Sequence, residues 1–151
     1  EARRAVEIYR DRYNEDGKSH FHVYPGMNDV LQALQMQGCC LGVATLKKEA
    51  FAREMLALSG LLPLFHTVCG MDTDDTLTKP ALIERCRLEM NAPPEETILI
   101  GDTVFDQIAA QDAGIAFLPV TYGFGFQGKE KPQTPAANSP DEIPKILNQI
   151  K

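Results

Sequence analysis

Short apolar runs, separated by amphipathic segments, constrain the fold of this chain more than any other feature. The run at 39–44 (CCLGVA) lies between Gly38 and Thr45 and has no polar residue in it, which is typical of a strand buried on both faces. Such strands belong to parallel sheets covered by helices on both sides. The run therefore predicts a parallel sheet.

Helical and strand-like patterns alternate along the rest of the chain. The pattern predicts strands at 39–44, 66–70, 97–100 and 115–120, and helices at 1–16, 27–38, 47–58, 80–90, 105–113 and 140–150, with a polar, proline-rich loop at 127–138. In the last helix Ser139 is the expected cap and Pro140 the first helical residue. Alternation with short connections predicts an α/β fold with a three-layer, doubly wound parallel sheet and right-handed crossovers. The 151 residues fit one domain.

Charge and composition exclude several kinds of partner. The chain carries 15 basic and 21 acidic residues, a net charge of −6, and no basic run, so we expect neither nucleic acid nor an anionic membrane as partner. No window approaches the roughly 18 apolar residues of a membrane span. The four cysteines have no metal-ligand spacing, and we expect free thiols in a cytoplasmic protein.

Polar residues follow the predicted strands, at the edge where open parallel sheets bind ligands. They are Thr45, the loop 71–79, Asp102 and Thr121. Asp102 and Asp106 place two carboxylates at a strand end and in the next helical turn, which suits Mg²⁺. The alternative is that Asp102 caps that helix and Asp106 favours its dipole.

Thr45 and Lys79 point to an anion at the same edge. The Thr45 hydroxyl and the backbone N–H of Leu46 precede a predicted helix, where anions bind; a simple N-cap is the alternative for Thr45. Lys79 precedes Pro80 at a helix start, where a nearby negative charge would explain a lysine. A solvated surface lysine is the alternative there.

Together these motifs resemble the haloacid dehalogenase-like (HAD) superfamily over essentially the whole chain, and its phosphoglycolate phosphatase-like branch most closely. The matching segments are VAT at 43–45, Lys79-Pro80 and GDTVFD at 101–106, framed by YPG at 24–26 and VTYG at 120–123.

The resemblance implies a Rossmann-like core and an Mg²⁺-dependent phosphatase that acts on a small phosphorylated metabolite through an aspartyl-phosphate. It implies that Thr45 and the Leu46 N–H bind the phosphoryl group and that Lys79 offsets its charge. Asp102 would ligate Mg²⁺. Asp106 would hold the metal, directly or through water, or orient Lys79.

The family's first motif, DxDx(T/V), carries the nucleophile on the central strand and is not found at the start of this chain. Residues 1–17 are then expected to be the last helix of a helical cap, and residues 18–151 a core truncated at its N-terminus. Loss of the central strand would leave two unpaired strand edges. We expect a vacant or repaired sheet centre, or a strand borrowed from another copy in a strand-exchanged homodimer, and no activity of this chain alone.

Two further motifs are weighed and set aside. Asp72 and Asp74 fit DxDxTLT, but they stand in a loop leading to Lys79, and a solvated loop is the better account. Residues 123–128 (GFGFQG) formally match a dinucleotide fingerprint, which needs a helix immediately after it. The segment that follows is rich in proline and polar residues, so we expect a flexible loop near the substrate.

Two other classes of function also fit these residues in part. A catalytically dead relative would bind phosphate or a protein partner through the surviving residues. A receiver-like signalling domain also uses acids, Thr and Lys at strand ends, but there the acids precede Thr and Lys, which is the reverse of the order in this chain.

Overall fold

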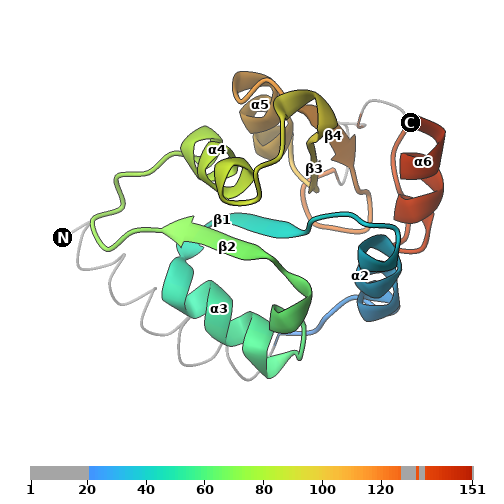
Figure 1. Ribbon diagram of the computed structural model, residues 1–151, viewed down its shortest axis with the longest axis horizontal. Coiled ribbons are helices and arrows are strands. Elements are labelled where there is room, and N and C mark those ends of the chain that lie inside the picture. The colour runs from blue at the N-terminus through green and yellow to red at the C-terminus, as the bar shows by residue number, and fades with distance from the viewer. Residues whose placement is uncertain (1–20, 127–131, 133–134, 151) are drawn as a thin grey trace.

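The computed structural model describes residues 21–126, 132 and 135–150, and these form an α/β fold with parallel strands (Figure 1). The strands are β1 (Gly42–Lys48), β2 (Thr67–Met71), β3 (Ile98–Gly101) and β4 (Ala116–Pro119). The helices are α2 (Met27–Met36), α3 (Glu49–Leu58), α4 (Lys79–Glu89), α5 (Val104–Asp112) and α6 (Glu142–Ile150), with 3-10 turns η1 (Leu62–Leu64) and η2 (Pro94–Glu96). The predicted order of strands and helices is confirmed. The helix predicted at 1–16 lies outside the described residues.

The strands form two parallel pairs. β1 pairs with β2, with Gly42 opposite Thr67, and β3 pairs with β4, with Ile98 opposite Ala116. α3 lies on one side of the β1–β2 pair and α4 on the other, and α4 also contacts α5 (Figure 1). The predicted α/β class is therefore confirmed, with the strands divided between two small sheets.

A cavity of about 810 Å³ separates the two pairs, and both β1 and β3 line it. In a parallel ladder, alternate residues of a strand direct both backbone groups to the same side. Thr97 and Gly101 accept hydrogen bonds from the N–H groups of Ala116 and Val120, so the backbone groups of Ile98 and Ile100 point away from β4, toward the cavity. Among the described residues, no strand fills the sheet centre along this edge.

The outer edges of the two pairs are covered, whereas no described strand pairs with the inner edges. On β2, Arg53 donates to the Val68 carbonyl at 3.0 Å and Glu49 accepts from the Gly70 N–H at 3.3 Å. On β4, the chain around Ala137 pairs with the strand end, because its N–H donates to the Pro119 carbonyl. Covered edges of this kind prevent pairing with other chains.

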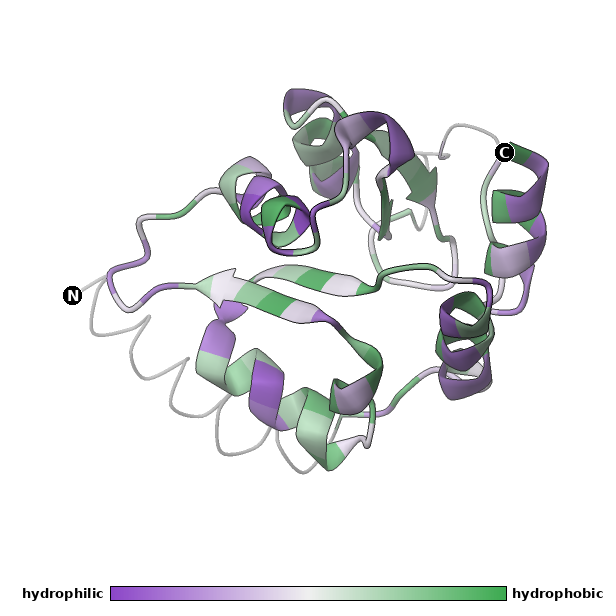
Figure 2. Ribbon diagram, in the orientation of Figure 1, coloured by the Kyte–Doolittle hydropathy of each residue, from purple (hydrophilic) through white to green (hydrophobic). Residues whose placement is uncertain are grey.

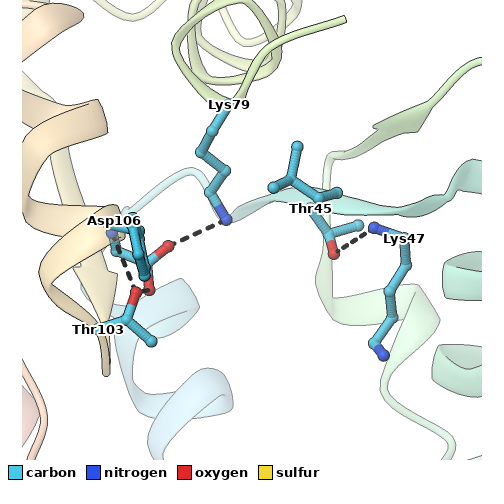
Figure 3. A pocket seen from close by; sticks show the side chains of 7 residues that line it. Thr45, Lys47, Lys79, Thr103 and Asp106 are labelled. Atoms are coloured by element: carbon cyan, nitrogen blue, oxygen red, sulfur yellow. Dashed lines mark hydrogen bonds and ion pairs between the residues drawn. The ribbon is translucent and has the colours of Figure 1, made fainter. Parts of the chain in front are cut away.

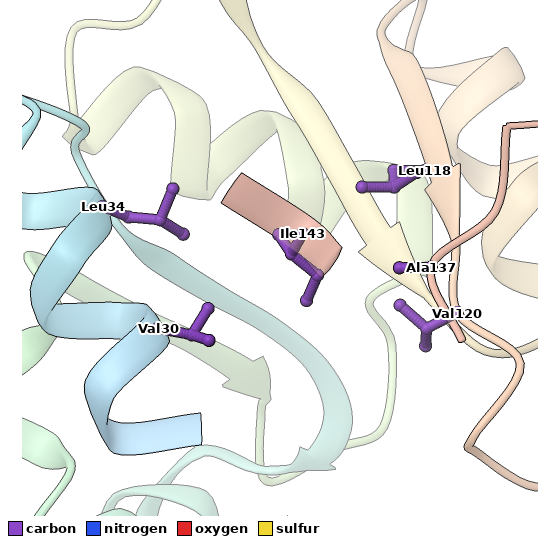
Figure 4. Packing of buried hydrophobic residues seen from close by; sticks show 6 residues of the cluster. All are labelled: Val30, Leu34, Leu118, Val120, Ala137 and Ile143. Carbon is purple, nitrogen blue, oxygen red and sulfur yellow. The ribbon is translucent and has the colours of Figure 1, made fainter. Parts of the chain in front are cut away.

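The largest buried cluster joins the second pair of strands to α2 and α6. It contains Val30, Leu34, Leu118, Val120, Ala137 and Ile143 (Figure 4). α2 and α6 pack side by side over it, and Figure 2 shows hydrophobic residues along the strands and mixed hydropathy on the helices around them. Burial of these apolar side chains is the main force that holds this region together.

The first predicted strand is displaced in the structure. β1 begins at Gly42 and continues to Lys48, which pairs with Met71 past an irregular register, so α3 begins two residues later than predicted. Burial on both faces is also wrong for β1: Val43 is half-buried and Gly42 is exposed, because this strand lines the cavity. A hydrophobic run indicates that a strand is suited to burial on both faces. It does not show whether both faces are covered in a given structure.

The start of the last helix also differs. Residues 139–141 form a turn in which the Ser139 carbonyl accepts from the Glu142 N–H at 3.2 Å, and α6 begins only at Glu142. Pro140 therefore precedes the helix and does not occupy its first position.

Candidate active site

Thr45 lies on β1 and lines a pocket of about 500 Å³ with Leu46, Lys79 and Asp106. Its hydroxyl accepts from the Lys47 N–H at 3.2 Å. The N-cap interpretation of Thr45 is wrong, because the N-cap of α3 is Lys48. For the same reason the N–H of Leu46 belongs to an extended strand and not to a helix N-terminus.

Lys79 joins the two halves of the molecule at this pocket (Figure 3). Its ammonium donates to the Ala44 carbonyl of β1 at 2.8 Å and lies 3.2 Å from the Asp106 carboxylate of α5. The two side chains are only 21% and 17% exposed. The negative charge expected beside Lys79 is therefore that of Asp106, and the interpretation as a solvated lysine is wrong.

Asp106 is fixed by reciprocal contacts with Thr103. The Thr103 hydroxyl donates to the Asp106 carboxylate at 2.8 Å and accepts from the Asp106 N–H at 3.1 Å (Figure 3). This is a capping arrangement at the start of α5, so Thr103, and not Asp102, caps that helix. A Cβ at Gly101 would lie 2.6 Å from the Asp106 Cβ, so only glycine allows this approach.

Asp102 follows β3 and is held by a different part of the chain. Its carboxylate accepts from the Phe124 N–H at 2.8 Å. Asp102, Asp106 and Lys79 all line the cavity between the strand pairs. One ammonium and two carboxylates therefore collect at the carboxyl ends of β1 and β3, where open α/β sheets bind ligands.

The donor set limits which metal ion fits this site. Within the described part of the chain, no group of three or more His, Cys, Asp or Glu side chains is placed to hold a metal. Two carboxylates nevertheless fit Mg²⁺, which keeps several waters and is bound through one or two carboxylates plus phosphate oxygens. A buried zinc or calcium cage does not fit.

The family model described as "Haloacid dehalogenase-like hydrolase" matches residues 1–120. The chain belongs to this family. A phosphoglycolate phosphatase from Vibrio vulnificus is 28% identical over 147 residues, which cover 97% of this chain and 62% of that protein. A 5'-nucleotidase from Pseudomonas aeruginosa is 33% identical, over 87% of this chain and 60% of its own length.

Solved structures agree with this membership. A predicted phosphatase from Clostridium acetobutylicum superposes with a TM-score of 0.87 at 32% identity, over 96% of this chain and 68% of that one. The chain spans less than two thirds of the length of the curated relatives named above. These likenesses support membership of the HAD-like hydrolase family. No described helix has the length and apolar character that a membrane crossing needs.

In this HAD-like hydrolase, the structure brings most of the expected residues together. Thr45, Leu46, Lys79 and Asp106 share one pocket, and Asp102 joins Lys79 and Asp106 in the larger cavity. Thr121 does not belong to the site, because its hydroxyl donates to Asn138 at 2.8 Å.

Sequence reasoning missed two groups that hold the site. Thr103 could have been found as the polar residue directly before the helix, a better cap position than Asp102. The Phe124 contact uses a backbone N–H, so the identity of its side chain could not predict it. Only the two glycines beside it, Gly123 and Gly125, indicated a close backbone approach.

The acidic loop after β2 is used for its own structure. The Asp72 carboxylate accepts from the N–H of Thr76 at 2.9 Å and from its hydroxyl at 2.5 Å, and these bonds lower the pKa of Asp72. Lys48 donates to the carbonyls of Asp72 and Thr73. Asp72 lines neither cavity.

Two titratable groups beside the HAD-like site are kept neutral. Burial, together with the neighbouring Tyr24 and Asp102, raises the pKa of Tyr122 to about 12; its ring meets that of Tyr24 edge-on, 4.9 Å between centroids. Burial, with Cys69 beside it, raises the pKa of Cys86 to about 12. Both groups stay protonated at neutral pH, and Cys86 is unsuited to nucleophilic attack.

Proposed function

We propose that this chain forms the phosphate- and metal-binding part of an Mg²⁺-dependent HAD phosphatase that hydrolyses a small phosphomonoester through an aspartyl-phosphate. The observation that carries the proposal is the placement of Lys79 between β1 and Asp106, with Asp102 on the same cavity. The names of the relatives, a phosphoglycolate phosphatase and a 5'-nucleotidase, support a phosphomonoester as substrate.

Each residue of the site has a role in this proposal. The ammonium of Lys79 offsets the negative charge of the phosphoryl group, and Asp106 keeps that ammonium aimed at the pocket. The Thr45 hydroxyl, which already accepts from the Lys47 N–H, donates its own proton to a phosphoryl oxygen, with the Leu46 N–H beside it.

Asp102 and Asp106 are the residues that would hold Mg²⁺. The ion supplies charge neutralisation for the phosphoryl oxygens during transfer. Asp102 is the better placed of the two, because Asp106 is already engaged by Lys79 and Thr103.

We infer that the attacking carboxylate comes from a strand that is not among the described residues. A parallel strand between β1 and β3 would pair with their cavity-facing backbone groups and end beside Lys79. The cavity of about 810 Å³ and the cover on both outer edges support this inference. The chain alone is then inactive.

We further place the protein in the cytoplasm, in keeping with the free thiols of its four cysteines.

The test measures hydrolysis of p-nitrophenyl phosphate with Mg²⁺ by two proteins. One is this chain. The other is this chain preceded by the N-terminal segment of the Vibrio vulnificus relative. We expect turnover only in the second protein and a loss of at least about 100-fold in its Asp102→Asn variant. Turnover by this chain alone, abolished by Asp72→Asn, would overturn the proposal.

A second candidate is a catalytically inactive domain that binds through strand pairing. The inner edges of β1 and β3, with which no described strand pairs, favour it, since they suit a strand from another copy as well as one from the same protein. Light scattering distinguishes the cases: a stable dimer of this chain, with no turnover from the fused protein, supports the strand-exchanged homodimer.

A further inference from the structure

Residues 123–125 (GFG) lie directly against Asp102, although nothing in the site's chemistry requires a glycine-rich loop there. The N–H of Phe124 donates to the Asp102 carboxylate at 2.8 Å. The Phe124 side chain is 85% exposed, so the contribution of this residue is its backbone.

Both glycines are required by the closeness of this contact. A Cβ at Gly123 would lie 2.6 Å from the Asp102 Cγ, and a Cβ at Gly125 would lie 2.6 Å from the Thr103 Cγ2 and 2.8 Å from its Cα. Real Cβ contacts are longer than this, so a side chain at either position would displace Asp102 or the start of α5. Gly123 is buried, which leaves no room to move outward.

We propose that the loop 123–125 is a positioning element that fixes the Asp102 carboxylate at the end of β3 for a divalent cation. The inference rests on the proposed function for the identity of the ion, but the contact itself is a property of this chain. The neighbouring Thr103 hydroxyl does not perform this task, because it donates to Asp106. The loop therefore does for Asp102 what Thr103 and Lys79 do for Asp106.

The first measurement tests the contact without any metal. A double-mutant cycle compares the unfolding midpoints of the wild type, Gly123→Ala, Asp102→Gly and the double variant. Asp102→Gly is used because the Asp102 Cβ also lies against an added Cβ at Gly123. We expect Gly123→Ala to lower the midpoint clearly, and to lower it much less when Asp102→Gly has removed the whole side chain. If Gly123→Ala lowers the midpoint equally with and without the Asp102 side chain, the proposed contact is wrong.

The second measurement tests positioning through the affinity for Mn²⁺, a paramagnetic substitute for Mg²⁺, read by electron paramagnetic resonance on this chain. We expect Gly123→Ala and Gly125→Ala to weaken Mn²⁺ binding at least fivefold, as Asp102→Asn does. Gly60→Ala is the control for a glycine-to-alanine change away from the site. Unlike Gly123 and Gly125, Gly60 has a positive φ (+73°), so the change strains the backbone, but nothing lies within 4 Å of the added atom. The Mn²⁺ affinity of this variant should therefore stay within twofold of the wild type.

A pair of variants at Phe124 separates the backbone from the side chain. Phe124→Pro removes the N–H and should weaken Mn²⁺ binding, whereas Phe124→Ala keeps it and should not. Wild-type affinity in Gly123→Ala and Phe124→Pro overturns the positioning role. If the wild type binds no Mn²⁺ but the double-mutant cycle shows coupling between residues 102 and 123, the metal site of the proposed function is wrong. The contact between the loop and Asp102 is then still supported. If the wild type binds Mn²⁺ without coupling, the inference fails and the metal site stands.

Discussion

Lys79 stands in the first turn of α4, where a positive charge meets the unfavourable end of the helix dipole. Its two partners, the Ala44 carbonyl and the Asp106 carboxylate, offset this cost. The ammonium thereby joins α4, β1 and α5 at one point. Lys79, the residue proposed to bind an anion, therefore also links the two strand pairs.

Replacement of this link should be measurable as stability. We expect Lys79→Met to lower the free energy of unfolding by about 1–2 kcal/mol, because it leaves the largely buried Asp106 carboxylate without its cation. Urea denaturation of the purified chain measures the change.

Lys145→Met is the matched control for this substitution. It removes a lysine that also bonds an aspartate, Asp141, but both side chains are about two thirds exposed. Exposed pairs of this kind contribute little, so no measurable loss is expected. Equal losses in the two variants would show that Lys79 has no special structural role.

Single residues also show what the sequence could and could not predict about the site. Lys79 and Asp106 were predicted from strand ends and helix starts, because their chemistry is carried by side chains. The contact of Asp102 with Phe124 was not, since it uses a backbone N–H from 22 residues away. Spacing along the chain carries no information about such a contact.

At the scale of elements, the outer edge of β2 is covered by side chains from two helices. Glu49 of α3 accepts from Gly70, Arg53 and Arg85, and Arg85 also bonds Glu89 of α4. Burial by itself would raise the pKa of Glu49, but the bonds from Gly70 and Arg53 and the charge of Arg85 lower it below its ordinary value of 4.5. The charged form of Glu49 therefore stabilises the fold.

The sign of this shift sets a pH dependence. With a folded pKa below the unfolded one, the contribution of Glu49 is complete above about pH 4.5 and is lost as pH falls through the lowered folded value. We expect Glu49→Gln to cost about 0.5–1 kcal/mol at pH 7 and less at pH 3, measured by denaturant titration at both values. Glu95→Gln, in the exposed turn η2, controls for the loss of one negative charge. An equal cost at both pH values would contradict the assignment.

The elements themselves were predicted well where their signals are local. The glycines that end α2 and α5, Gly38 and Gly114, have positive φ as their positions require. The end of β1 was predicted too early, because the strand continues to Lys48, which pairs with Met71 of β2 past an irregular register, and residues 46–48 have no apolar pattern of their own. Pairing with a distant strand overrode the local signal.

At the scale of the whole molecule, the two strand pairs face each other across edges with which no described strand pairs. Ile100 lies on such an edge and is 36% exposed, although it is an apolar residue within a β-strand. An edge with apolar residues and free backbone groups invites pairing with another chain. We expect self-association of this chain at high concentration.

A lysine on that edge tests the expectation. Ile100→Lys should reduce the concentration dependence of the molar mass measured by light scattering, because an edge lysine opposes strand pairing. Leu88→Lys is the control, since Leu88 is an exposed apolar residue of α4 outside the cavity. A molar mass that responds equally to both substitutions would contradict edge pairing as the cause.

The alternating direction of the backbone groups on β3 has a consequence for hydrogen exchange. The N–H of Leu99 faces β4, whereas those of Ile98 and Ile100 face the cavity, so protection should alternate from one residue to the next within a single strand. A strand buried on both faces has no period-two alternation in its hydrophobicity, but we expect that alternation in the exchange rates of β3. Loss of the alternation would show that another strand has paired with β3.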